Sequence, residues 1–263
     1  MEIRGRRECQ SCGTRWSYYD TGAVTCPDCG SPHSVGLEDE RRLHTATAGS
    51  LDLSAAREAA AADRFAEAAR LAEDAARSFV RDHGFVDGGV LQPLDDRFVA
   101  TQELCFAAAL LAGGRTPSDA ERRYLLALLS GAAEGERPPA EAVPAGAHSA
   151  RGLAAAAAVA AYRRDLLRWR DATDADLPPA ATRLLGRLAD HRKRVDALDG
   201  AVPPADADAL VAAARALGAS LLALDAGGGT ADAGAGDGPA DGVPEVDREH
   251  LEAARASLER FEP

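Results

Sequence analysis

The sequence predicts a mainly α-helical protein, in which a small N-terminal β module precedes an all-α helical bundle of about seven helices. Three observations support this prediction. Four of the five cysteines lie in two close pairs between residues 9 and 29. From about residue 54 onwards, apolar residues recur at three- and four-residue spacing, the period of a helix. The period-two alternation typical of strands does not return after residue 50.

Residues 1–37 form the predicted β module. Aromatic and β-branched residues stand on both sides of the turn signal Asp20-Thr21-Gly22, a composition that favours a small β-hairpin. These flanking residues are Trp16, Tyr18, Tyr19, Val24 and Thr25. Four arginines balance four carboxylates in this segment, so the net negative charge of the chain lies in the remaining residues.

The domain 51–225 is predicted to be the helical bundle, and it follows a polar connector at 38–50. Residues 54–83 carry one apolar stripe, and Asp63 is a candidate break that would turn this region into a helical hairpin. A linker rich in Pro, Gly and Ala is expected at 134–147. Further helices are predicted at 95–111, 117–130, 149–170, 179–198 and 204–225.

Residues 226–243 are predicted to be a disordered linker, because this stretch consists almost entirely of Gly, Ala, Asp, Thr and Pro and buries too little apolar surface to offset its ordering entropy. A C-terminal amphipathic helix is predicted at 244–263. One face of this helix carries Leu251, Ala254, Leu258 and Phe261. We expect this face to dock on the bundle rather than to capture a partner.

The chain is acidic, since 42 Asp and Glu against 30 Lys and Arg give a formal net charge of −12, and Lys193 is its only lysine. An acidic, lysine-poor and alanine-rich composition fits a high-salt cytoplasm, where dense carboxylates keep a protein hydrated. A GC-rich genome is the alternative explanation for the alanine. At molar salt, the counterion-release gain that drives binding to nucleic acid largely disappears.

No membrane-spanning segment is expected. The longest apolar run, Gly152–Tyr162, is far shorter than the roughly 20 residues needed to cross a bilayer. The N-terminus enters the cysteine motif without the apolar stretch of a secretory signal. We therefore expect a cytoplasmic protein.

The spacing of the N-terminal cysteines predicts one structural Zn²⁺ ion. Cys9-x2-Cys12 and Cys26-x2-Cys29 are two knuckles separated by thirteen residues, enough for a short hairpin that brings both pairs to one ion. A glycine directly follows each second cysteine and permits the positive φ angle that such turns favour. Four thiolates leave no open coordination position, so the ion is expected to be structural rather than catalytic.

Other interpretations of the cysteines have less support. Disulfides need an oxidising compartment, and thioredoxin-like chemistry needs a βαβ context that the sequence lacks. Iron is a minor alternative, because Cys26-Pro27-Asp28-Cys29-Gly30 matches one knuckle of a rubredoxin, although thirteen intervening residues are too few for the usual core of that fold. His33 and His44 lie nearby and are expected at the surface or beside the ligands, since structural zinc is four-coordinate.

The cysteine segment also carries a resemblance to a known family. Residues 4–19, Arg-Gly-Arg-Arg-Glu-Cys-Gln-Ser-Cys-Gly-Thr-Arg-Trp-Ser-Tyr-Tyr, together with Cys26-Pro27-Asp28-Cys29-Gly30-Ser31, resemble uncharacterised haloarchaeal proteins with an N-terminal transcription-factor-B-type zinc ribbon. The resemblance implies a zinc ribbon, a helical remainder and no established activity. In transcription factor B the ribbon docks on RNA polymerase, and two cyclin-like repeats follow it.

The leading functional hypothesis is a non-enzymatic adaptor that binds another protein, transcription machinery included. The alternative is a nucleic-acid-binding regulator, in which ribbon arginines contact phosphate and aromatic side chains stack on bases. Its candidate residues are Arg4, Arg6, Arg7, Arg15 and Trp16, with Tyr18 or Tyr19. The competing interpretation, that the aromatics form the ribbon's own core and the arginines pair with carboxylates, is favoured because the segment is neutral overall.

No enzymatic activity and no catalytic residue are expected. The best catalytic candidate is Arg77-x5-His83, whose spacing is similar to the Arg-x4-6-His motif of HEPN-type ribonucleases. His83 more simply ends a helix, where a cationic side chain suits the C-terminal dipole. Gly227-Gly228-Gly229 is not followed by Lys and Ser/Thr in the arrangement that a phosphate-binding loop requires.

Overall fold

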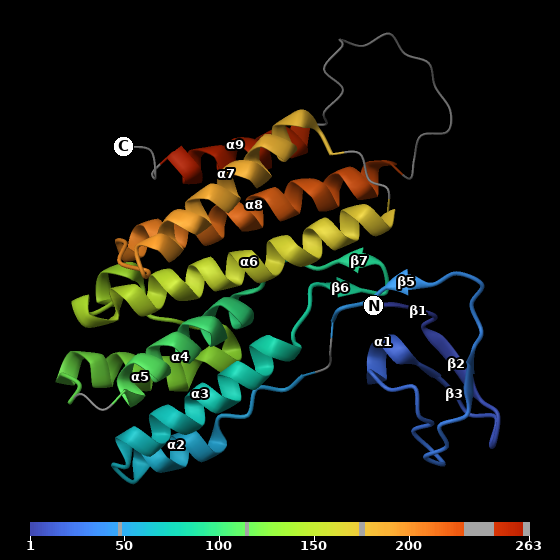
Figure 1. Ribbon diagram of the computed structural model, residues 1–263, viewed down its shortest axis with the longest axis horizontal. Helices are drawn as coiled ribbons and strands as arrows, with labels where there is room; N and C mark the ends of the chain where they lie inside the picture. The colour runs from blue at the N-terminus through green and yellow to red at the C-terminus, as the bar shows by residue number, and fades with distance from the viewer. Residues whose placement is uncertain (47–48, 114–115, 174–176, 229–244, 260–263) are drawn as a thin grey trace.

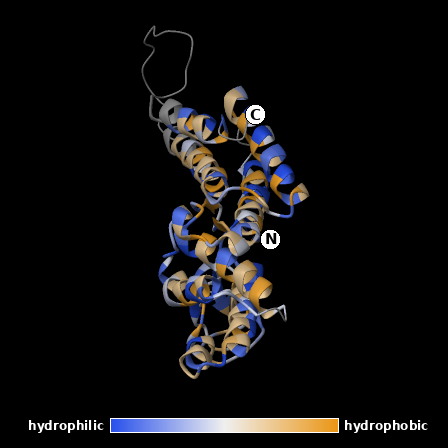
Figure 2. Ribbon diagram, turned by 90° about the vertical axis from the view of Figure 1, so that its left-hand side faces the viewer, coloured by the Kyte–Doolittle hydropathy of each residue, from blue (hydrophilic) through white to orange (hydrophobic). Residues whose placement is uncertain are grey.

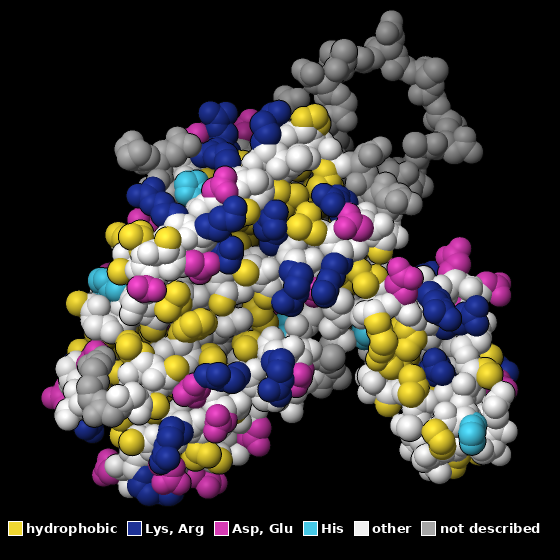
Figure 3. Space-filling view, in the orientation of Figure 1, with side chains coloured by type: hydrophobic (Ala, Val, Ile, Leu, Met, Phe, Trp, Pro, Cys, Tyr) yellow, Lys and Arg dark blue, Asp and Glu magenta, His cyan; other side chains and the backbone are white. Residues whose placement is uncertain are grey.

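Figure 1 shows a small β-ribbon at the N-terminus and a larger helical body beside it. This computed structural model describes residues 1–46, 49–113, 116–173, 177–228 and 245–259. The predicted fold class, mainly α with a small N-terminal β-ribbon, is confirmed. In the space-filling view the ribbon projects from the helical body, so that much of its surface is open (Figure 3).

Two short antiparallel sheets build the ribbon. Its strands are β1 (Glu2–Ile3), β2 (Arg6–Cys9), β3 (Arg15–Ser17), β4 (Ser34–Gly36) and β5 (Arg42–Leu43). Three of them have the order β3-β2-β4, so β2 is central and β4 is an edge strand. The other sheet pairs β1 with β5, a strand within the segment that was expected to be a polar connector.

The expected hairpin around Asp20-Thr21-Gly22 is wrong. This triplet instead ends a one-turn helix, α1 (Tyr18–Thr21), in which Ser17 Oγ accepts the Asp20 N–H at 3.3 Å and Gly22 has a φ of 65°. The hairpin of the ribbon joins β2 and β3 across the first cysteine knuckle. An N-cap serine and a left-handed C-cap glycine stabilise the helical turn, and this local capping outweighs the strand propensity of the tyrosines.

Eight helices, α2 to α9, follow in the described part of the chain. The expected number was about seven, and the difference arises because residues 54–83 form two helices separated at Asp63, whose φ is 57°. Their bounds are α2 (Ser54–Ala61), α3 (Phe65–Asp82), α4 (Asp96–Ala112), α5 (Asp119–Gly131), α6 (His148–Thr173), α7 (Pro179–Ala197), α8 (Pro204–Gly228) and α9 (Glu245–Glu259).

Side-chain caps fix the starts of two of these helices. Asp95 Oδ1 accepts the Phe98 N–H at 2.6 Å at the start of α4, and Ser118 with Glu121 forms a capping box at the start of α5. Between α5 and α6, where a linker was expected at 134–147, the chain forms three short 3₁₀ turns, the first of which begins before that range. They are η1 (Ala132–Glu134), η2 (Ala140–Ala142) and η3 (Ala145–Ala147).

The expectation that no strand follows residue 50 is wrong. A small hairpin, β6 (Val86–Asp87) and β7 (Val90–Leu91), lies between α3 and α4. Two-residue strands are too short to show alternation in a sequence. The hairpin is held instead by the ribbon, since the Gly89 N–H donates to Leu43 O at 2.8 Å.

Polar bonds attach the ribbon to the helical body at this hairpin. Asp165 on α6 is almost fully buried, and its Oδ2 accepts the Thr45 hydroxyl at 2.8 Å and the Phe85 N–H at 3.0 Å. One turn further along α6, the Trp169 indole N–H donates to Gly89 O at 3.1 Å. Because α6 reaches both the hairpin and the ribbon, it sets the position of the ribbon beside the body (Figure 1).

The helical body has one continuous core, in which α6 packs against α4, α7 and α8. Most helices carry hydrophilic and hydrophobic residues on different faces (Figure 2). Alanine fills much of the core, and a few large side chains anchor it, among them Phe85, Phe98, Tyr162 and Trp169. Full burial of one large apolar side chain contributes about 1.5–3 kcal/mol.

A buried polar network joins α4, α5, α6 and α8. Glu103 accepts the Tyr124 hydroxyl at 2.5 Å, an Arg137 N–H at 2.9 Å and an Arg151 N–H at 2.8 Å. Arg151 also donates to both oxygens of Asp208, at 2.9 and 2.7 Å. Burial, together with the Glu103 carboxylate, raises the pKa of Tyr124, which therefore keeps its proton and donates. These charges are paired, as a low-dielectric interior requires.

Helix α9 lies on α7 and α8 (Figure 1), as expected for an amphipathic helix that docks on its own bundle. Leu251, Ala254 and Leu258 are buried there. Phe261, the fourth member of the expected apolar face, is outside the described residues. The predicted disordered linker at 226–243 also falls largely outside them, and its first three residues complete α8.

Candidate metal centre

The first cysteine knuckle follows directly from strand β2. Cys9 is the last residue of the strand, and the chain turns back on itself so that the Cys9 N–H donates to Thr14 O at 2.9 Å. Within the turn, the Gly13 N–H donates to Cys9 O at 3.0 Å, and the Ser11 N–H approaches Cys9 Sγ at 3.4 Å. Gly13 has a φ of 77°, a conformation that disfavours any side chain.

The second knuckle repeats the first. The Cys26 N–H donates to Ser31 O at 2.9 Å, and the Gly30 N–H donates to Cys26 O at 3.0 Å, with Gly30 at a φ of 70°. A Cβ atom on either knuckle glycine would meet nothing within 4 Å. Backbone conformation, and not lack of space, therefore requires glycine at these two positions.

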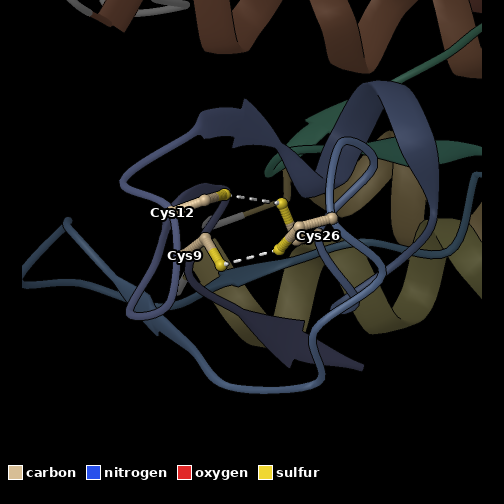
Figure 4. A group of neighbouring side chains, drawn as sticks. Cys9, Cys12 and Cys26 are labelled. Atoms are coloured by element: carbon tan, nitrogen blue, oxygen red, sulfur yellow. Dashed lines mark hydrogen bonds between the residues drawn. The ribbon is translucent and has the colours of Figure 1, made fainter.

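The two knuckles bring four sulfur atoms together. The Sγ atoms of Cys9, Cys12, Cys26 and Cys29 all lie within 4.8 Å of one another. Two of the S–S distances, Cys9–Cys29 and Cys12–Cys26, are 3.6 Å, each joining one knuckle to the other (Figure 4). A disulfide needs about 2.05 Å, whereas a tetrahedral ion with metal–sulfur bonds of about 2.3 Å places its ligands about 3.8 Å apart.

Hydrogen bonds and burial give the cysteine thiols different pKa values. Backbone N–H groups of the first knuckle, first that of Cys12, lower the pKa of Cys9 to about 6. The Thr14 hydroxyl lowers the pKa of Cys12. A backbone bond from Ser31 lowers the pKa of Cys29, but the neighbouring sulfurs and burial outweigh it and raise this pKa to about 12. Four thiolates this close repel one another, so full ionisation of the group needs a bound cation.

Polar side chains that were not among the predicted site residues tie the two knuckles together. Ser11 Oγ and Ser31 Oγ are 2.9 Å apart, and the Thr14 hydroxyl donates to Asp28 Oδ2 at 3.2 Å. The signal for them was present, because each residue lies within two positions of a cysteine. These bonds hold the ligand-bearing turns at a fixed separation.

Trp16 belongs to the ribbon's own core. It is 9% exposed, packs with Cys9 and Cys26, and donates its indole N–H to Ala23 O at 3.0 Å. Tyr18 is equally buried, at 8%. These rings are therefore not presented to solvent as a platform on which bases could stack.

The two nearby histidines lie outside the sulfur cluster. His33 is exposed. His44 is buried between Tyr18 and Tyr19 at the junction with the helical body, where its Nδ1 accepts the Gly88 N–H at 3.2 Å. Among the described residues, the four cysteines are the one group of His, Cys, Asp or Glu whose ligand atoms lie close enough to hold a metal ion.

Arg77 and His83, the candidate HEPN-like pair, lie in two different environments. Arg77 donates to Glu73 on the exposed surface of α3. His83 packs among the rings of Phe79, Phe85 and Phe98, with centroid separations of 4.7–5.3 Å. Burial in this aromatic cluster lowers the pKa of His83.

Together, the fold and the sulfur cluster define the class: a helical-bundle protein with an N-terminal four-cysteine ribbon that could hold one metal ion. Over residues 1–232 the chain matches the model of a family of unknown function, DUF7117, and it belongs to that family. Helix α9 lies beyond the matched residues. No curated protein and no solved structure matches the chain. Among the described residues, no helix is long and apolar enough to span a membrane.

Proposed function

We propose that this protein is a non-enzymatic adaptor that binds another protein through its N-terminal ribbon, which is held by one structural Zn²⁺ at Cys9, Cys12, Cys26 and Cys29. The observation that carries the proposal is the convergence of four sulfurs from two knuckles. Four thiolates form the donor set of structural zinc sites and leave no position for substrate or water. The ion would then stabilise the fold of the ribbon and leave recognition to its surface.

One face of the ribbon sheet offers a surface for a protein partner. Val35 and Leu37, two residues apart at edge strand β4, share a face and are each 41% exposed. An edge strand with exposed apolar side chains favours pairing with a strand of another protein. The resemblance to the transcription-factor-B-type ribbon supports a partner in the transcription machinery.

The nucleic-acid alternative receives less support from the geometry. Trp16 is buried, and two of the four candidate arginines are paired: Arg15 Nε lies 2.6 Å from Glu8 Oε2, and Arg6 Nε lies 3.5 Å from Glu38 Oε1. A sequence-independent binder instead presents a continuous basic surface with accessible aromatic rings.

The four thiols of the site also support a cytoplasmic location. Thiols persist in a reducing cytoplasm, where disulfides are rare, and this is where we place the protein. The acidic, lysine-poor composition supports a salt-adapted, haloarchaeal source.

Metal analysis of reduced, chelator-free protein tests the zinc site. We expect one zinc per chain by plasma mass spectrometry, and replacement by Co²⁺ should give the visible absorption of a tetrahedral thiolate site. A zinc content near zero, or iron in its place, would contradict this part of the proposal.

Affinity capture from a high-salt, nuclease-treated lysate tests the adaptor role. The informative variant is Val35→Ser with Leu37→Ser, and the matched control is Leu126→Ser with Leu198→Ser, because those leucines are exposed on the helical body. We expect the control and the unmodified protein to retain a protein partner that the ribbon variant loses. Equal recovery by all three, or recovery of nucleic acid alone without nuclease, would count against the adaptor.

A further inference from the structure

A second site on the ribbon collects arginine side chains. A hollow of about 330 Å³ opens where β1, β2 and β4 approach the segment before β5. Its lining residues are Glu2, Ile3, Arg4, Arg7, Gly36 and Arg41. Arg41 was not among the sequence candidates, because it follows the acidic run Glu38-Asp39-Glu40 and its position beside Arg7 depends on the return of the chain to β1.

The arginines are held in place by the ribbon. Arg7 Nε donates to Ser34 Oγ at 3.1 Å, and its NH2 group donates to Ser34 O at 3.4 Å. An Arg4 NH2 group donates to Asp39 O at 3.4 Å. Gly36 gives Arg4 room, since a Cβ at Gly36 would lie 2.7 Å from the Cβ and Cδ of Arg4. The backbone of β4 is therefore compatible with an arginine lying across it.

The hollow has an excess of positive charge. Among the described residues, Arg4, Arg7 and Arg41 make no ion pair, whereas Arg6 and Arg15 do. Glu2 is the single carboxylate among the lining residues. A guanidinium carries five N–H donors, and the bonds to Ser34 and Asp39 use few of them. Three guanidinium groups with unused donors thus surround one space.

We propose that this hollow binds a phosphate group, carried by a nucleotide or by a nucleic-acid strand. The planar fork of a guanidinium matches phosphate oxygens in charge and geometry, and a space of about 330 Å³ admits a phosphate ester. At the high salt that the acidic composition fits, the counterion-release gain of binding a long polyanion largely disappears, which favours the free nucleotide as the source.

The phosphate site is separate from the proposed protein-binding surface. Side chains alternate between the faces of a sheet, so Arg7 and Gly36 lie on one face and Glu8 and Val35 on the other. Loss of either function by mutation should therefore leave the other intact.

Calorimetric titration of the full chain with inorganic phosphate, AMP and ADP, in buffer free of phosphate and sulfate, tests the proposal. A fluorescent oligothymidylate is titrated in parallel by anisotropy. The test variant is Arg4→Gln with Arg41→Gln. The control is Arg6→Gln with Arg15→Gln, which makes the same change in charge at the paired arginines on the opposite face. Zinc content and circular dichroism establish that both variants fold.

We expect ADP to bind the unmodified chain, and the test variant to lose about tenfold or more in affinity for each arginine removed, while the control changes little. Tighter binding of the oligothymidylate than of ADP, with the same dependence on Arg4 and Arg41, would assign the phosphate group to a strand. Absence of binding to all four probes, or an equal loss in the control variant, would overturn the proposal.

Discussion

The two knuckle glycines show how single residues determine the metal site. Gly13 and Gly30 both have positive φ angles and open space around them. A residue with a side chain at either position would clash with no neighbour. Its backbone would still have to adopt the left-handed conformation of the turn, at a cost of about 1–2 kcal/mol. The sequence predicted this role from the spacing alone, because glycine follows the second cysteine of each pair.

Gly30→Ala should weaken zinc binding, whereas Gly186→Ala should stabilise the folded protein. Gly30→Ala strains the second knuckle, so we expect zinc affinity, measured by competition with a chromophoric chelator, to fall about 5- to 30-fold.

Gly186 is exposed in the interior of α7, and a Cβ atom there would meet nothing within 4 Å. Alanine at this position should therefore raise the free energy of unfolding by about 0.5–1 kcal/mol. Weaker stability in urea for Gly186→Ala would contradict this account.

His83 should make stability depend on pH. Burial among aromatic rings lowers the pKa of His83 in the folded protein below the ordinary value of 6.5. As the pH falls below 6.5, the unfolded chain therefore binds more protons than the folded chain does. The stability that the neutral imidazole contributes is therefore present above about pH 6.5 and declines as the pH falls towards the folded-state pKa.

The variant His83→Phe should reduce this acid dependence, because it preserves the aromatic cluster without a titrating group. Urea denaturation at a series of pH values is the measurement, and His33→Gln, at an exposed histidine, is the control. An unchanged slope below pH 6.5 in His83→Phe would show that other groups carry the acid sensitivity.

At the scale of elements, helices were predictable and short strands were not. The helix break at Asp63 coincides with the left-handed conformation of that single residue. The helix starts at Asp95 and Ser118 follow from local caps, since the bonded groups lie within four residues of one another. The hairpin β6–β7 depends instead on Thr45 and Asp165, which are far away in the chain. Local patterns cannot report bonds of that kind.

Thr45→Val tests how the ribbon is attached. The change removes the hydroxyl that donates to Asp165 and accepts the Val86 N–H at 3.0 Å, so a buried amide loses its partner. We expect a loss of about 1–3 kcal/mol in the free energy of unfolding, faster hydrogen exchange at Val86, and unchanged zinc content. Thr173→Val is the matched control, because the Thr173 hydroxyl bonds only to its own helix in the described structure. Equal effects of the two variants would exclude a special role for Thr45.

At the scale of the whole molecule, the ribbon and the helical body have separate cores. Cys9, Trp16 and Cys26 form a small cluster of their own, whereas the helices share one large cluster. A ribbon with so few buried residues cannot offset the ordering entropy of its chain by packing alone. Its stability should therefore come from the metal, and that of the body from apolar burial.

Chelation should unfold the ribbon and spare the helices. The chain has two tryptophans, one in each part, so the variant Trp169→Phe leaves Trp16 as the single reporter. On addition of a strong chelator, we expect the Trp16 emission to shift to longer wavelength while the far-ultraviolet helical signal changes little, with recovery on addition of Zn²⁺. Parallel loss of both signals would mean that the body depends on the ribbon.

The sequence by itself determined the fold class, the helices and the grouping of the four cysteines as candidate metal ligands. Each of these depends on a pattern among residues close together in the chain: apolar periodicity, helix caps and knuckle spacing. It also allowed the tyrosines of α1 to be mistaken for a strand, since capping by Ser17 and Gly22 competes with strand propensity over only a few residues. Only the tertiary structure decided which arginines are paired, where Arg41 lies, and how Asp165 joins the ribbon to α6. Those features depend on the distances between remote segments, and packing fixes these distances.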